Sequence, residues 1–355
     1  MMLNGINMYP GSAEYPRNQW YVIAFSHEVT NEPIGRECLG TPIVLFRTES
    51  GQPVALFDRC PHRGMKLSQG KCIGSNIQCG YHGVQFSSEG MGVVLPSGGS
   101  IPSKMMVNSY PLVEKWEWIW VWMGESELAD PALIPNHDEL GLTGENANGD
   151  SGLYLHVKAN YLLPHENLVD ATHITFLHHG LIDTGNVALV PTKVDVNGPR
   201  VSMRREFIDE PMPDMLRKSF GMRGDRLDRI LTLTSHAPNL CIIENTFKER
   251  DIPDAQEKTN RLVVAVTPEG ERGTHQFACF GNSYPEKHPQ RYDDLHHLLM
   301  EDVVVIEDIQ RNFDRLGLEN CPEVSVRSDE GGIRTRRIIA EMILQERERE
   351  QKAIA

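Results

Sequence analysis

Two short segments constrain this chain more than any others, residues 60–64 (Cys-Pro-His-Arg-Gly) and residues 79–83 (Cys-Gly-Tyr-His-Gly). Each segment offers one thiolate and one imidazole, and sixteen residues separate His62 from Cys79. Thiolates and imidazoles are the side chains that most often hold transition metals in proteins. The sequence therefore predicts a pair of loops that together form one metal site.

Two kinds of metal site fit this set of ligands. Two sulfur and two nitrogen ligands could hold a tetrahedral zinc ion. They could also hold a Rieske [2Fe–2S] cluster, in which two Cys bind one iron and two His bind the other. Zinc fingers usually group Cys with Cys and His with His, whereas each loop here carries one of each. We therefore expect a Rieske cluster on Cys60, His62, Cys79 and His82, with zinc as the alternative.

The kind of Rieske protein can be narrowed further. High-potential Rieske proteins of respiratory complexes carry an additional Cys in each loop, where this chain has Met65 and Tyr81. Those proteins also have a membrane anchor, and no apolar run here approaches the roughly 18–20 residues of a membrane span. A small Rieske ferredoxin would end near residue 120, but more than 230 residues follow. The extra length predicts a second domain with a task of its own.

The composition excludes several classes of protein. With 355 residues the chain is long enough for two domains, and its net charge of −14 argues against nucleic acid or an anionic membrane as a partner. Residues 1–10 lack the basic region and the apolar run of a signal peptide, so we expect a cytoplasmic protein. The Cys residues outside the two loops are scattered, which indicates free thiols. They are Cys38, Cys72, Cys241, Cys279 and Cys321.

The pattern of turns and apolar runs predicts an α+β protein with two domains. Residues 1–125 are expected to form an all-β Rieske domain, residues 126–152 a linker rich in Pro, Gly and Asn, and residues 153–355 a catalytic domain. In the second domain, expected helices alternate with strand-like runs, which indicates an antiparallel sheet. The helices are expected around 160–180, 211–230 and 289–317, and the strands at 240–243, 261–266 and 275–280.

Residues 116–122 contain four of the five Trp residues at every second position. Side chains two residues apart lie on one face of a strand, so this run predicts four Trp on the same face. We interpret it as a buried strand that anchors the first domain, in preference to a platform on which a ligand stacks.

A second metal site is indicated by residues 167–178. Asn167, Asp170 and His173 recur every three residues, which places them on one face of a helix. His178 lies about 140° from His173 on an ideal helix. Both imidazoles could bind one metal only if the helix ends or distorts between them, and Gly180 makes an end nearby plausible.

Mononuclear iron that activates oxygen is typically held by two His and one carboxylate on one face. The expected helix at 289–316 supplies the carboxylate, because Asp302 lies within about 20° of the centre of its apolar stripe. An unpaired carboxylate in a core is costly, so Asp302 needs a partner such as a metal. Three other acidic residues lie far from the stripe and are expected to be solvated. They are Glu301, Glu307 and Asp308.

These features together resemble the Rieske non-heme iron oxygenases, and within them the group of vanillate O-demethylase and dicamba monooxygenase. The resemblance covers nearly the whole chain, and it is carried by the two Cys–His loops and by the Asn-x2-Asp-x2-His-x4-His pattern of residues 167–178. It implies a helix-grip-like second domain with an antiparallel sheet and long helices. It also implies that His173, His178 and Asp302 bind the mononuclear iron.

The resemblance also implies how electrons reach the iron and which partner protein supplies them. In the family, an Asp at the position of Asp170 bridges a cluster His of one subunit to an iron His of its neighbour, which implies a ring, usually a homotrimer. Electrons are expected from a separate NAD(P)H-dependent reductase, with or without a ferredoxin, because the chain lacks a nucleotide-binding Gly-rich fingerprint. NAD(P)H and flavin are thus expected only on that partner.

The expected function is that of the terminal oxygenase, which uses O2 to hydroxylate or O-demethylate an aromatic compound. Asp170 and Asn167 are its expected catalytic residues. Two alternatives remain open. One is a Rieske-type dioxygenase acting on another small hydrophobic substrate, and the other is an electron carrier whose second domain is not catalytic.

Overall fold

The computed structural model describes residues 2–3, 5–10, 12–136, 140–141, 152–178, 182, 185–282, 291–317, 320 and 322–354. Its contacts divide the chain into two compact units. The cluster unit comprises residues 17–134 and 267–270. The iron unit comprises residues 1–16, 135–266 and 271–355, so that the N-terminal segment groups with the second half of the chain. The two units are described separately.

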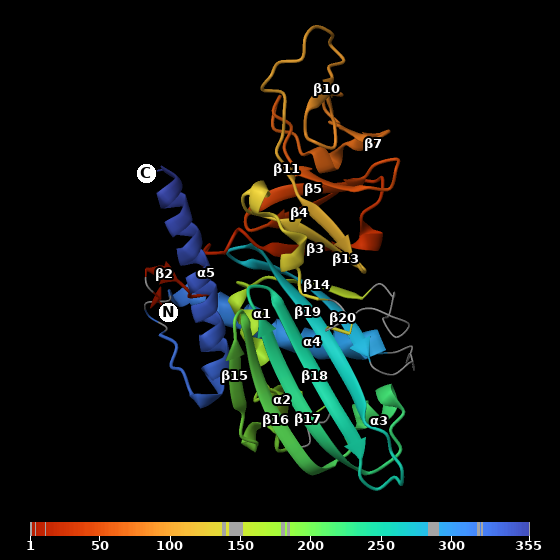
Figure 1. The fold of residues 1–355 in the computed structure, drawn as a ribbon, viewed down its shortest axis with the longest axis vertical. Helices are drawn as coiled ribbons and strands as arrows, with labels where there is room; N and C mark the ends of the chain where they lie inside the picture. The colour runs from red at the N-terminus through yellow and green to blue at the C-terminus, as the bar shows by residue number, and fades with distance from the viewer. Residues whose placement is uncertain are drawn as a thin grey trace. The chain divides into compact units, whose positions relative to one another are not determined.

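The cluster unit consists of three small antiparallel sheets, as the turn-rich sequence predicts (Figure 1). The first contains, in spatial order, β12 (Leu112–Lys115), β13 (Trp118–Trp122) and β3 (Trp20–Phe25). The second contains β11 (Ser109–Tyr110), β6 (Pro53–Phe57), β5 (Thr41–Arg47) and β4 (Ile34–Cys38). The third contains β10 (Gly92–Val94), β9 (Gln85–Phe86), β8 (Asn76–Gln78) and β7 (Lys71–Ile73). Short 3₁₀ turns connect them: η1 (Ser26–Glu28), η2 (Leu67–Gln69), η3 (Ser126–Leu128) and η4 (Pro131–Leu133).

The Trp-rich run forms the central strand of the first sheet, and all five residues of β13 are buried. This confirms the interpretation as an anchoring strand. Trp116 differs from the prediction, because it has a φ of 58° and lies in the turn between β12 and β13. The strand therefore begins two residues later than the alternating pattern indicates.

The iron unit is built on a seven-stranded antiparallel sheet (Figure 1). Its order is β14 (Leu153–Val157), β20 (Gly273–Asn282), β19 (Lys258–Gly270), β18 (Leu240–Glu249), β17 (Arg226–His236), β16 (Arg200–Pro211) and β15 (Lys193–Asn197). The strand runs predicted at 240–243, 261–266 and 275–280 all lie within it. A separate pair of short strands, β1 (Met2–Leu3) and β2 (Ile6–Asn7), precedes the sheet in the chain.

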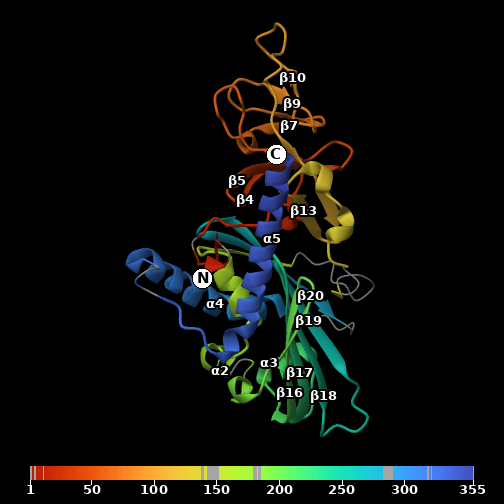
Figure 2. The same cartoon turned by 60° about the vertical axis from the view of Figure 1, so that its left-hand side comes forward.

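One face of this sheet packs against helices (Figure 2). The helices that contact the sheet are α1 (Leu162–Val169), α4 (Arg291–Leu316) and α5 (Glu330–Ile354). The unit also contains α2 (Ile174–Leu177), α3 (Asp214–Phe220) and the 3₁₀ turns η5 (Val187–Leu189) and η7 (Arg327–Asp329). We call the helix-covered face of the sheet the inner face. His165 of α1 contacts it through Ser235, and Gly331 of α5 packs on Met203. A Cβ at Gly331 would lie only 2.5 Å from the Sδ atom of Met203, so a side chain there would force the Met203 side chain to move.

Two of the expected helices are shorter than predicted. The helix expected at 211–230 comprises only α3, because β17 begins at Arg226 and pairs with both of its neighbours. The helix expected around 160–180 is broken into α1 and α2. Sheet pairing overrides helix propensity in the first case. The second break shapes the iron site.

The α+β class with an antiparallel sheet in the second half of the chain is confirmed. Among the described helices, none is both long and apolar enough to cross a membrane.

Candidate metal centres

The two Cys–His loops have the same backbone geometry. In the first, the N–H of Cys60 donates to the carbonyl of Met65 (2.8 Å) and the N–H of Gly64 donates to the carbonyl of Cys60 (2.9 Å). In the second, Cys79 donates to Val84 (2.8 Å) and Gly83 donates to Cys79 (3.1 Å). Both Gly64 and Gly83 have a positive φ, which glycine adopts without strain. The repeated five-residue spacing therefore gives two copies of one turn.

These turns bury the sulfur ligands and expose the nitrogen ligands. Cys60 and Cys79 are only 1% and 2% exposed, whereas His62 and His82 are exposed and their ring centroids lie 4.5 Å apart. Burial raises the pKa of the Cys60 thiol, while the backbone N–H groups of His62 and Arg63 lower it by donating to the sulfur. Such N–H groups are the donors that tune an iron–sulfur cluster.

The four loop residues are not arranged around a single ion. Within the residues that the structure describes, the only group of three metal-ligating atoms lying within 4.8 Å of one another is found elsewhere. A tetrahedral zinc site would hold all four ligand atoms at that spacing or closer. A two-iron cluster separates the Cys pair from the His pair, so the loops fit the cluster and not zinc.

The candidate iron site begins where α1 ends. Asp170 is the C-terminal cap of α1 and has an extended conformation, with φ −110° and ψ 116°. His173 and His178 then flank the single turn of α2 as its N-cap and C-cap. Asn167, Asp170 and His173 therefore do not lie on one continuous helix, contrary to the prediction. A first break lies before His173, and α2 then ends at Leu177, close to the end expected near Gly180, which is itself outside the described residues.

This local shape brings the two imidazoles together against α4. The Nε2 atom of His173 lies 3.5 Å from Oδ1 of Asp302, and Nε2 of His178 lies 3.2 Å from the same oxygen. The three ligand atoms lie within 4.8 Å of one another, and Asp302 is 5% exposed as the apolar stripe predicts. Two His and one carboxylate on one side of a point are the usual ligands of non-heme Fe(II).

The surroundings prepare these side chains for a metal. Asn167 donates through Nδ2 to Oδ1 of Asp302 at 3.1 Å, which fixes the carboxylate. Burial lowers the pKa of His173 despite the nearby Asp302, so its ring is held neutral, the form in which imidazole binds metals. Burial also lowers the pKa of His178, but hydrogen bonds to Asp302 and Glu301 outweigh burial and raise it overall.

Two acidic residues of α4 differ from their predicted solvated state. Oε2 of Glu301 lies 2.7 Å from Nδ1 of His178, on the side of the ring opposite Asp302. Oε1 of Glu307 accepts from the backbone N–H of Lys158 at 3.0 Å. Asp308 is solvated as predicted, with its side chain 65% exposed. The helical angle alone could not reveal Glu301, because its partner belongs to a distant segment.

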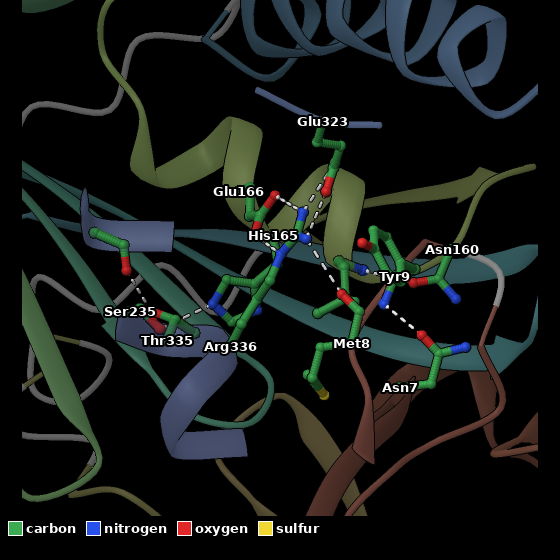
Figure 3. Close-up of polar contacts among 12 residues, drawn as sticks. Asn7, Met8, Tyr9, Asn160, His165, Glu166, Ser235, Glu323, Thr335 and Arg336 are labelled. Carbon is green, nitrogen blue, oxygen red and sulfur yellow. Dashed lines mark hydrogen bonds and ion pairs between the residues drawn. The ribbon is translucent and has the colours of Figure 1, made fainter. Parts of the chain in front are cut away.

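An ion-pair network centred on the buried guanidinium of Arg336 holds α1 in place (Figure 3). The guanidinium of Arg336 on α5 pairs with both carboxylate oxygens of Glu166 and also with Glu323 at 2.8 Å. It donates to the backbone carbonyl of Met8 at 3.2 Å as well, which joins the N-terminal segment to α1 and α5. Since Glu166 precedes Asn167, this network positions the end of α1 that faces the iron site. No motif in the sequence singled it out.

A cavity of about 640 Å³ extends from this network to the iron site. Asn167, Asp170 and His173 line it together with Glu166 and Arg336. Asp170 is held in the wall of the cavity by Thr172, whose N–H and hydroxyl donate to the carboxylate at 2.7–2.8 Å. The carboxylate is thus fixed beside an iron-site His in a wall that is open to a cavity.

Comparison with protein families assigns both halves of the chain. Residues 19–111 match the Rieske [2Fe-2S] domain, and residues 157–345 match the vanillate O-demethylase oxygenase C-terminal domain. The first range contains both Cys–His loops, and the second contains His173, His178 and Asp302.

Individual relatives match over nearly the whole chain. The dicamba O-demethylase oxygenase component of Stenotrophomonas maltophilia is 30% identical over 338 residues, covering 88% of this chain and 95% of the relative. The vanillate O-demethylase oxygenase subunit of a Pseudomonas species (strain HR199 / DSM 7063) is 30% identical over 356 residues, covering 96% and 98%.

Solved structures show the same fold. Dicamba monooxygenase bound to 3,6-dichlorosalicylic acid has a TM-score of 0.83 at 28% identity, and the match covers 94% of this chain and 99% of that one. Dicamba monooxygenase with non-heme iron and dicamba has a TM-score of 0.77 with the same coverage. This chain therefore belongs to the vanillate O-demethylase family of Rieske oxygenase components, oxidoreductases that use a Rieske [2Fe–2S] cluster and a mononuclear non-heme iron.

Proposed function

We propose that this chain is the terminal component of a monooxygenase system that hydroxylates or O-demethylates a small aromatic compound. The observation that carries the proposal is the convergence of His173, His178 and Asp302 in a chain that also has two Cys–His loops. The relatives support the substrate class, since their names refer to dicamba, vanillate and toluene-4-sulfonate.

The geometry supports an assignment of ligands to each metal. We assign the cluster to Cys60, Cys79, His62 and His82, because two turns with the same backbone hydrogen bonds bury both Cys and expose both His, whose ring centroids lie 4.5 Å apart. The mononuclear iron is assigned to His173, His178 and Asp302 as a set of two imidazoles and one carboxylate.

When bound, the cluster supplies single electrons and the mononuclear iron supplies the activation of O2. The protein holds the side chains that bind the iron in fixed positions. Asn167 holds Oδ1 of Asp302, and the fold keeps His178 buried at 2% exposure, so neither side chain must reorganise to bind the iron. Asn167 and Asp170 therefore act on the metal site without being ligands.

The substrate is proposed to lie over the inner face of the sheet. One row across it contains Arg205, Leu231, Asn245 and Asn260, which are opposite one another on β16, β17, β18 and β19. Asn260 is 8% exposed, and within the described part of the chain its Oδ1 has no hydrogen-bond partner. Since a buried acceptor without a partner is costly, a hydroxyl or amino group on the substrate would satisfy it.

Electrons are proposed to reach the iron through Asp170 from the cluster of a neighbouring subunit in a homotrimer. Asp170 lies between His173 and a cavity, fixed by Thr172, which suits a residue that links an incoming imidazole to an iron ligand. A closed ring of identical subunits provides one such contact per chain. The electrons are proposed to come from a separate NAD(P)H-dependent reductase, with or without a ferredoxin, and the system is proposed to be cytoplasmic.

Metal content and oxygen uptake test the proposal. The purified chain should contain about three iron and two acid-labile sulfide per chain. A panel of methoxylated and methylated aromatics is then supplied with a generic NAD(P)H reductase, and oxygen uptake, formaldehyde and hydroxylated product are measured. Two iron per chain with no substrate-dependent oxygen uptake would instead indicate an electron carrier. Both oxygen atoms in the product would indicate a dioxygenase.

A further inference from the structure

The imidazole of His178 lies between two consecutive carboxylates of α4. Its Nδ1 is 2.7 Å from Oε2 of Glu301, and its Nε2 is 3.2 Å from Oδ1 of Asp302. Successive residues on a helix point about 100° apart, so their side chains can reach opposite edges of one ring. A single turn of α4 thus holds His178 from both sides.

The two edges of the ring have different tasks. A His that binds a metal through one nitrogen usually donates its other N–H to a carboxylate, which fixes the tautomer and strengthens the ligand. Because Glu301 can accept the proton of Nδ1, Nε2 is the nitrogen that faces Asp302 and His173 and can give up its proton to bind a metal. We infer that Glu301 is a positioning residue of the iron site, which sets the orientation, tautomer and donor strength of His178. The inference rests on the proposed iron ligands.

The second imidazole is held differently. Among the described residues, no carboxylate is hydrogen-bonded to Nδ1 of His173, and the side chain of His173 is 24% exposed against 2% for His178. His178 is therefore the anchored ligand, with its carboxylate partner on the helix that supplies Asp302. His173 is instead oriented by its place at the start of α2.

Glu301→Ala and Glu301→Gln test this role through metal binding. The Fe(II) dissociation constant is measured by competition with a chelator on protein stripped of mononuclear iron, with the cluster followed by its visible spectrum. Loss of such a carboxylate partner weakens metal binding by about 10–100-fold, which we expect for Glu301→Ala. Glu301→Gln keeps an acceptor oxygen without the charge, so a smaller loss is expected. The visible spectrum should not change in either variant.

The redox potential of the mononuclear iron is the second readout. A carboxylate on Nδ1 makes His178 a stronger donor and favours Fe(III), so both variants should raise the potential, and Ala more than Gln. A merely structural role for Glu301 would not order the potentials in this way. Glu307→Gln is the matched control, because Glu307 lies on the same helix but contacts the backbone N–H of Lys158 and the side chain of Arg311 in place of an iron-site His. It should leave both the affinity and the potential unchanged.

Each outcome decides the matter. If Glu301→Gln binds Fe(II) with wild-type affinity and potential, the inference is wrong, whether or not the Ala variant folds. Asp302→Ala, measured in parallel, separates this failure from that of the proposed ligands. Should Asp302→Ala also keep wild-type affinity, the assigned ligand set is wrong. If only Asp302→Ala loses iron, the ligand set stands and Glu301 has no role in it.

Discussion

The two metal regions of this protein are built by opposite means. The cluster loops are local, and each forms its turn through hydrogen bonds between residues at most five apart. The iron site is assembled from distant segments, because 124 positions separate His178 on α2 from Asp302 on α4. The loops expose their histidines, whereas the iron site buries His178 and Asp302.

This difference has a consequence for function. Exposed histidines place the cluster where electrons can enter and leave through the surface. The side chains of His178 and Asp302 are instead fixed by packing beside a cavity that can admit a substrate. A mutation in one region should therefore remove the metal of that region and leave the metal of the other in place.

The largest expected effects come from removing one ligand in each region. Asp302→Ala should weaken the binding of the mononuclear iron by more than about 100-fold, because losing a ligand costs more than losing a residue that only hydrogen-bonds to a ligand. It should also abolish turnover. Its visible cluster spectrum should be unchanged. Cys79→Ala should lose the cluster spectrum and turnover but keep one iron per chain. Metal analysis with visible spectra checks both, and loss of both metals in either variant would contradict independent regions.

Combining the two variants tests whether the regions cooperate across subunits. Subunits with Asp302→Ala keep the electron source, and subunits with Cys79→Ala keep the iron. In a trimer that contains both variants, one of the three contacts pairs an intact cluster with an intact iron of the neighbour, so about a third of wild-type turnover should return. Mixed oligomers purified through two different tags allow the measurement. Inactive mixed rings would show that electrons stay within one chain.

Asp170→Asn should separate the regions without removing either. The side chain keeps its size and can still pair with Thr172, so both metals should remain bound. Without the carboxylate charge, we expect turnover to fall by about 100-fold, or about 2.7 kcal/mol in activation free energy. Stopped-flow measurement of cluster reoxidation in the presence of substrate and O2 gives the rate directly. Normal reoxidation would exclude Asp170 from the electron path.

The cluster loops could be predicted from the sequence because their geometry is local. The spacing of Cys60 and His62, with Gly64 to close the turn, contains nearly all the information that the turn needs. The β-rich first half and the strands of the second half followed from turn residues and apolar runs in the same way. Trp116 was misplaced because a turn interrupts the alternating pattern.

The iron site was only partly predictable, because tertiary contacts decide its details. Asp302 followed from its position in an apolar stripe. Glu301 did not, since its partner His178 lies in another part of the chain. The end of α1 at Asp170 was also missed, because the extended cap has no glycine or proline to mark it. Cys321 and Gly180 lie outside the described residues.

The Arg336 network behind α1 should contribute mainly to stability. Loss of the buried Arg336 guanidinium leaves two partly exposed carboxylates unpaired, so Arg336→Met should destabilise the iron unit by about 2 kcal/mol, less than breaking a fully buried pair would. Arg334→Met is the matched control on the same helix, because the Arg334–Glu330 pair is exposed and such pairs are worth about 0.3–0.5 kcal/mol. Urea unfolding followed by far-UV circular dichroism compares them. Equal losses of unfolding free energy in the two variants would show that the Arg336 network stabilises α1 no more than an exposed ion pair does.

A smaller effect should distinguish the two units by their response to acid. Burial lowers the pKa of His165 to about 4, and its Nε2 lies 2.9 Å from Oγ of Ser235. The unfolded chain takes up this proton near pH 6.5, whereas the folded iron unit takes it up only near pH 4. The unfolded state is thus favoured progressively as the pH falls through this range, and about 2 kcal/mol of stability should be lost between pH 7 and pH 5.

His165→Gln should remove this acid sensitivity, because glutamine can meet Ser235 but does not titrate. All five Trp residues of the chain lie between residues 20 and 122, so Trp fluorescence follows the cluster unit alone. Far-UV circular dichroism reports on the sheet and helices of the iron unit as well. The substitution should flatten the pH dependence of the circular dichroism transition and leave the fluorescence transition unchanged. An equal change in both would mean that the units unfold together, and an unchanged pH dependence in both would exclude His165 as the acid-sensitive group.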